Sequence, residues 1–204
     1  HYWLPLSDKP YAAITAQLAT IEADAIFIAL DGNATADFLM QYWKNGGTLP
    51  IIGGSITFDP TLLGANSIFH ARLLGAIAAS PLSDGDQGSG WQQFVATYRA
   101  RYPDAAEVPS LFAFSYYVNT KAALLALDAV DGELSDGRNA FRGALAKLSF
   151  ETPVGRVSLD ENRQAIANNY VIEIALGEDN HLHHEVAYVA TSVDQTLGLG
   201  RERY

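Results

Sequence analysis

The chain has 204 residues, of which 49% are hydrophobic and 18% charged, the composition of a globular protein that can bury a core. Its net charge of −10 argues against nucleic acid and polybasic membrane contacts, because both require a basic face, and the acidity fits a role in solubility. The absence of cysteine excludes disulfides, thiolate metal sites and a cysteine nucleophile, and it fits an oxidising compartment.

The first five residues do not have the pattern of a signal peptide. Residues 1–5 lack an initiator Met, a basic start and a long apolar region, so they are not a signal peptide, and no run in the chain is long enough to span a membrane. We therefore expect the chain to begin within a longer polypeptide. Residues 1–6 are predicted as a short strand, and residues 11–21 as a helix that starts near Ser7, Asp8 and Pro10.

Residues 23–54 predict a strand, a helix and a second strand. Residues 25–30 form an unbroken apolar run, which is typical of a strand buried on both faces. Asp31 is an N-cap candidate for the helix, residues 45–47 end it, and residues 50–53 begin the second strand. In such a unit the strands are parallel, and ligands bind beyond their carboxyl ends. The residues that follow the two strands are Asp31, Gly32 and Asn33, and Gly54, Ser55, Ile56 and Thr57.

The rest of the chain alternates helical and extended patterns. Helices are predicted over 61–63, 91–102, 110–130 and 137–148. Strands are predicted over 75–80, 152–160 and 170–176, the last pairing with 186–190 as a hairpin. Residues 68–74 fit either a helix or a strand. Residues 82–90 predict a flexible loop that cannot pack a core, and residues 191–204 a surface tail.

No motif in the sequence indicates catalysis or a cofactor. His181, His183 and His184 place two imidazoles on one strand face, but without a third ligand an exposed turn explains them better than a metal site. The Ser-Asp pairs lack the Gly-x-Ser-x-Gly elbow, and Gly53-Gly54 is not part of a phosphate or dinucleotide loop. The sequence therefore predicts a protein that is not an enzyme, with no cofactor and no metal.

The order of these segments resembles one known family over about residues 4–176. The series ADAIFIALDGNATADFL, PIIGG, GAIAASP, FVATYRARYPD, SLFAFSYYVNTKAALLAL and TPVGRVSLDENRQAIANNYVIEI is similar to the C-terminal part of a periplasmic branched-chain amino-acid-type solute-binding protein. These leucine/isoleucine/valine-binding-like, type I proteins are components of ABC transporters. The most telling segment is TPVGRVSLD, followed by a strand that ends in Glu-Ile.

The resemblance implies an α/β fold of two lobes, each a parallel sheet flanked by helices, with ligand in the cleft between them. Residues 1–77 would belong to the second lobe, 83–165 to the first lobe, and 168–204 to the second lobe and a C-terminal tail. The N-terminal part, which carries most of the first lobe's sheet, would be missing from this chain. We expect that part as a partner, since the first-lobe helices would otherwise expose large apolar faces.

The family's ligand contacts in the second lobe fall, by the same resemblance, on Asp31, Gly32, Asn33, Gly54 and Ser55. Ser55 stands where amino-acid-binding members carry an acid that pairs with the ligand's ammonium group. Asp31 can replace that acid, but helix capping is a sufficient structural reason for it. The first-lobe aromatic maps to Phe112 or Phe114, either of which can equally be a core residue.

The resemblance implies an extracytoplasmic solute-binding component, located in the periplasm, that delivers a small ligand to ABC permease membrane subunits. The missing acid and the additional aromatics favour an aromatic carboxylate, with a branched or aromatic amino acid as the other candidate. The alternative function is a ligand-sensing regulatory or receptor module on the same fold. Neither function involves nucleic acid.

Overall fold

The computed structural model describes residues 1–4, 11–59, 63 and 70–196. It divides into two compact units. Unit 1 comprises His1–Ala79 and Glu173–His183, and unit 2 comprises Ser80–Ile172 and His184–Tyr204. The chain therefore passes between the units three times, at residues 79–80, 172–173 and 183–184. The predicted lobe division at 1–77, 83–165 and 168–204 concerns a complete two-lobe protein and stays a prediction.

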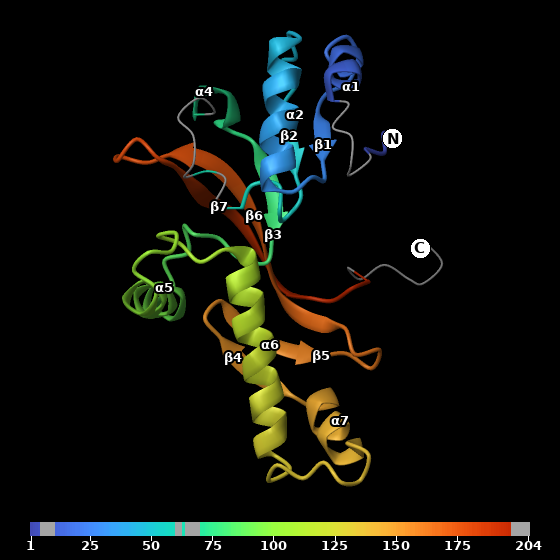
Figure 1. Ribbon diagram of the computed structural model, residues 1–204, viewed down its shortest axis with the longest axis vertical. Helices are drawn as coiled ribbons and strands as arrows, with labels where there is room; N and C mark the ends of the chain where they lie inside the picture. Colours follow the sequence, from blue (N-terminus) through green and yellow to red (C-terminus); the bar gives the residue numbers. More distant parts are fainter. Residues whose placement is uncertain (5–10, 60–62, 64–69, 197–204) are drawn as a thin grey trace. The chain divides into compact units, whose positions relative to one another are not determined.

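Unit 1 is built on three parallel strands, β1, β2 and β3 in that order (Figure 1). Ile26 pairs with Ile51, and Ile52 pairs with Ile77, so the three strands lie in close register. The sheet continues beyond β3, where the backbone N–H of Ile174 donates to the Ala76 carbonyl oxygen at 2.9 Å. The bounds of the unit's strands and helices are β1 (Ile26–Ile28), β2 (Ile51–Gly53), β3 (Ile77–Ser80), α1 (Tyr11–Leu18), α2 (Gly32–Lys44) and α4 (His70–Leu73).

Helix α2 connects β1 to β2 and buries its apolar stripe. Asp31 caps it as predicted, and its last turn ends at Asn45, whose N–H donates to the Gln41 carbonyl oxygen at 3.0 Å. Leu39 and Tyr42 are fully buried on this helix. Helix α1 packs against α2 (Figure 1). The predicted strand–helix–strand unit with parallel strands is confirmed.

The opposite face of the unit 1 sheet is open among the described residues. Phe27 is 67% exposed, Ile52 40% and Ile77 42%, although all three lie on apolar strands in mutual register. Successive strand residues point to opposite faces, so these three share one face. The prediction that residues 25–30 are buried on both faces is therefore wrong for the described part of the chain.

The described helices of unit 2 are α5 (Ser89–Arg101), α6 (Leu111–Asp128) and α7 (Asn139–Ala146). Ser110 caps α6 by accepting a hydrogen bond from the N–H of Ala113 at 3.2 Å. Helix α7 packs beside α6 (Figure 1). The core of the unit joins three buried side chains from different segments, Leu82, Trp91 and Phe114. These helices confirm the helices predicted over 91–102, 110–130 and 137–148.

Antiparallel strands complete unit 2: β4 (Ser149–Thr152), β5 (Gly155–Leu159), β6 (Ala165–Leu176) and β7 (Leu182–Val193). The last two also contribute residues to unit 1, and they pair with each other as predicted. The strand predicted over 152–160 is confirmed for Gly155–Leu159 but is wrong at its start, because Thr152 ends β4 and pairs with Gly155 across a tight turn at Pro153 and Val154. Gly155 adopts φ 119° there, a conformation that favours glycine.

Several other predictions are settled by the described residues. Residues 70–73 are helical, which decides the ambiguous segment, and the first helix ends at Leu18 rather than at residue 21. Residues 1–4 form no strand, while Ser7, Asp8, Pro10 and the helix predicted over 61–63, apart from Leu63, lie outside the described residues. His184 is 1% exposed within β7, so the exposed turn predicted for the histidines is wrong at this position. No helix in the described part of the chain is long and apolar enough to cross a membrane.

Candidate ligand-binding site

The loops that follow β1 and β2 meet at the carboxyl edge of the unit 1 sheet. The N–H of Gly54 donates to the Ile28 carbonyl oxygen at 3.1 Å, which joins the second loop to the end of the first strand. The hydroxyl of Thr57 donates to the same carbonyl oxygen at 2.9 Å and accepts from Gly54 N–H at 3.1 Å. Thr57 is fully buried. Thr57 therefore links the loop after β2 to the end of β1 through these two hydrogen bonds.

Asp31 is the charged group of this loop pair. It lies in extended conformation, and its Oδ1 accepts a hydrogen bond from the N–H of Ala34 at 3.1 Å. The residue is exposed, so its carboxylate can contact a ligand while it caps α2. Gly32 and Asn33 form the first turn of that helix, where backbone N–H groups lack intrahelical acceptors. Ser55 is partly exposed and supplies no charge.

Thr35 is a positioning residue that the sequence analysis did not identify. It is fully buried, and its hydroxyl donates to the Leu30 carbonyl oxygen at 3.0 Å. This bond fixes the segment that follows β1 to the first turn of α2, so it shapes the loop that carries Asp31. The only local signal was a threonine four residues after the N-cap Asp31. Its burial depends on tertiary packing, which the sequence does not display.

The two candidate aromatics occupy different environments on α6. Phe114 is 6% exposed and packs edge-on against Trp91 and Phe94, with ring centroids 6.0 Å apart in both pairs. Phe112 is 60% exposed. Phe114 is therefore a core residue of unit 2, while Phe112 is available for contact. Whether either of them contacts a ligand stays a prediction.

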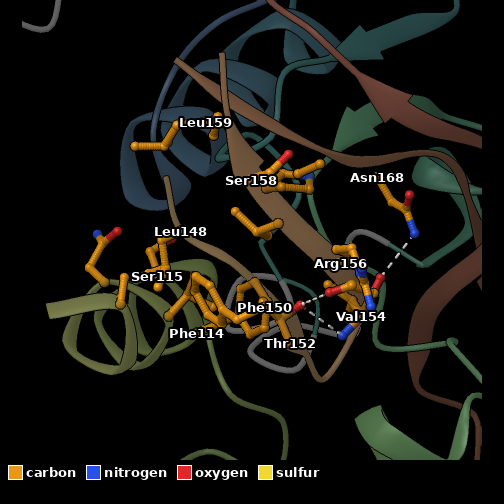
Figure 2. Close-up of a pocket in the computed structure, with 18 of the residues that line it drawn as sticks. Phe114, Ser115, Leu148, Phe150, Thr152, Val154, Arg156, Ser158, Leu159 and Asn168 are labelled. Atoms are coloured by element: carbon orange, nitrogen blue, oxygen red, sulfur yellow. Dashed lines mark hydrogen bonds between the residues drawn. The ribbon is translucent and has the colours of Figure 1, made fainter. Parts of the chain in front are cut away.

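Unit 2 has a pocket of about 290 Å³ between α6, α7 and the β4–β6 strands (Figure 2). Figure 2 shows the side chains of Phe114, Leu148 and Phe150 gathered at one side of it. Ligand pockets of proteins start at about 300 Å³ and are mostly apolar. By size and lining, the pocket suits a small apolar group.

The polar groups at the rim of this pocket are engaged with each other. The Thr152 hydroxyl donates to the Gly155 carbonyl oxygen at 2.6 Å, and the Asn168 amide donates to the Val154 carbonyl oxygen at 3.1 Å (Figure 2). Arg156 pairs with Glu151, with 2.7 Å between the guanidinium and the carboxylate. These bonds hold the β4–β5 hairpin together and join it to β6, so the polar groups at the rim have a structural role. In the part of the chain that the structure describes, no group of three or more His, Asp and Glu side chains could hold a metal ion.

Comparison with known proteins places this fold in a family. The periplasmic binding protein family profile matches residues 2–180. The structure is similar to an ABC transporter substrate-binding protein from Sphaerobacter thermophilus, with 23% identity over 90% of this chain and 48% of that chain, and a TM-score of 0.76. A search of curated proteins finds no match.

Two further similar structures are described by the ligand that they bind. A solute-binding protein of an ABC transporter from Rhodopseudomonas palustris BisB5, in complex with 3,4-dihydroxybenzoic acid, is 20% identical over 93% of this chain and 51% of that chain, with a TM-score of 0.80. The leucine-binding protein LivK from Thermotoga maritima is 19% identical over 93% of this chain and 51% of that chain, with a TM-score of 0.72.

The chain thus has the type I periplasmic binding protein fold, that of solute-binding proteins rather than enzymes. It belongs to the periplasmic binding protein family. It spans about half the length of the solved structures that it resembles.

Proposed function

We propose that this chain is the C-terminal part of an extracytoplasmic solute-binding component of an ABC transporter. It binds a small carboxylate in the cleft between two lobes and delivers it to a membrane permease. The family membership supports this proposal most directly, because it joins the fold to transport-associated relatives. The ligand contacts both lobes, so it binds the closed arrangement better and shifts the population toward closure.

The ligand is an aromatic acid or a branched or aromatic amino acid. A relative in complex with 3,4-dihydroxybenzoic acid and another named for leucine support these two classes. The loops after β1 and β2 decide between them. Asp31 offers a carboxylate for an ammonium group, whereas Ser55 is neutral, so an amino-acid ligand depends on Asp31 and an aromatic acid without an amine does not.

The substitution Asp31→Asn separates the two ligand classes in the complete polypeptide. Asparagine caps helices about as well as aspartate, so α2 stays capped while the negative charge is lost. Asp24→Asn is the matched control, since Asp24 is exposed before β1, at the other end of the strand. Calorimetric titration with leucine and with 3,4-dihydroxybenzoate measures the binding affinity of both variants. Binding of neither compound, nor of other branched or aromatic amino acids and benzoates, would contradict the proposed function.

The N-terminal part of the same polypeptide covers surfaces that this chain leaves open. Parallel sheets bury both faces, yet the face of Phe27, Ile52 and Ile77 is exposed here. On α6, Tyr116 is 74% and Leu124 61% exposed, and apolar surface of this kind favours aggregation of an isolated domain. A complete chain about twice as long, as in the relatives, supplies the residues to cover them.

A further inference from the structure

The three connections between the units converge on one loop of unit 2, residues 82–88, which we name the clamp loop. The loop begins two residues after the first connection, at residues 79–80. Tyr170 lies just before the second connection, and His184 is the first residue of unit 2 after the third. Both side chains contact the clamp loop through its two carboxylates.

Asp84 joins the clamp loop to β7. Its Oδ1 accepts a hydrogen bond from the backbone N–H of His184 at 2.8 Å and lies 3.1 Å from the Nδ1 of the same residue. The side chains are 9% and 2% exposed, so water screens this pair poorly. Gly85 approaches so closely that a Cβ would overlap the His184 carbonyl oxygen. The loop and the strand are thus in backbone contact as well.

Asp86 joins the clamp loop to β6. The hydroxyl of Tyr170 donates to its Oδ2 at 2.7 Å, while Oδ1 accepts from the N–H of Gly88 at 2.7 Å. Tyr170 is 5% exposed. Leu82, at the start of the loop, is buried in the core with Trp91. Each of the three connecting segments is therefore attached to the same short loop.

We propose that Asp84 and Asp86 are positioning residues that fasten the three connecting segments to one another within unit 2, so that they move as one body there. The two bonds act together because both depend on one ordered loop, and loss of either loosens the other. Hinge closure, which rests on the proposed function, then pivots on the unit 1 side of these bonds.

Amide hydrogen exchange on the complete polypeptide tests the coupling. Tyr170→Phe removes one oxygen and keeps the ring, so the fold is retained. If the two bonds depend on one ordered loop, the exchange rate of the His184 amide should rise about tenfold in this variant, although Tyr170 makes no bond to Asp84. Asp84→Ala should in turn speed exchange of the Gly88 amide. Tyr188→Phe is the matched control, since Tyr188 is 63% exposed on β7.

Two results would overturn the proposal. The first is a change confined to each residue's own partner, which would mean that the two bonds are independent. The second is an equal rise at every amide of unit 2, including Ala113 at the start of α6, which would mean global loosening. Asp160→Ala gives the reference for losing an ordinary turn carboxylate, since Asp160 accepts from the N–H groups of Asn162 and Gln164 at 2.8 Å each.

Discussion

Gly85 offers the sharpest test of the packing around the clamp loop. A Cβ at this position would overlap the backbone carbonyl oxygen of His184, which cannot rotate away as a side chain could. Gly85→Ala therefore pushes the loop away from β7. Overpacking costs about 1–3 kcal/mol, and a displaced loop also weakens the bond from His184 N–H to the Asp84 carboxylate, worth about 1.5–3 kcal/mol. We expect Gly85→Ala to lower the free energy of unfolding by at least about 2 kcal/mol.

Gly143→Ala is the matched control, because it makes the same chemical change on α7, where a Cβ would have no neighbour within 4 Å. Alanine is favoured over glycine inside a helix by up to about 1 kcal/mol, so this variant should be slightly more stable. Urea unfolding of the complete polypeptide measures both midpoints and slopes. If the free energy of unfolding of Gly85→Ala lies within about 0.5 kcal/mol of that of the unchanged protein, the clamp loop is not packed against β7.

Three further predictions concern stability. Burial, and then the bond to Asp86, raise the pKa of Tyr170, so its contribution to stability is complete below pH 10. As the pH rises further, that contribution falls by about 1.4 kcal/mol per pH unit. Tyr170→Phe should therefore flatten the alkaline fall in the free energy of unfolding measured by urea titration, and a fall as steep as in the unchanged protein would refute this prediction. In the complete polypeptide Phe27→Glu should cost about 2 kcal/mol or more, whereas Met40→Glu on α2 should cost less than about 0.5, and equal costs would mean that nothing covers the sheet face. Phe114→Ala should cost about 3–5 kcal/mol in the same assay, and a cost under about 1 would place the ring outside the core.

The strand–helix–strand unit of unit 1 could be predicted because its signals are local. The apolar run at residues 25–30, the cap at Asp31 and the stop at residues 45–47 each act within a few residues. Their spacing therefore indicates the type of each element without reference to any tertiary contact. The same holds for α6, whose length and Ser110 cap are readable from the sequence.

The clamp loop was misjudged because its order comes from distant partners. Residues 82–90 are rich in Ser, Asp and Gly, which locally indicate flexibility. Their bonds run to Tyr170 and His184, 84 and 100 residues away along the chain. Composition carries no record of such partners. The buried His184 was missed for the same reason, since its neighbours in sequence are polar.

The candidate site was only partly predictable. The meeting of the loops after β1 and β2 follows from parallel pairing, and the bonds from Gly54 and Thr57 to Ile28 place them together. The burial of Phe114 and the exposure of Phe112, two residues apart on α6, depend on what packs against each side of the helix. Helical periodicity gives the angle between them but not which side faces the core.

We expect the complete polypeptide to bind a small carboxylate or amino acid, and a thermal-shift panel measures that binding. The panel compares leucine, isoleucine, valine and phenylalanine with benzoate, hydroxybenzoates and phenylpropenoic acids. At 100 times its dissociation constant a ligand adds about 2.7 kcal/mol, which raises the unfolding midpoint by several degrees. We expect such a rise for at least one aromatic acid or one branched or aromatic amino acid. An unchanged midpoint with every member of the panel would mean that the complete polypeptide does not bind these ligand classes.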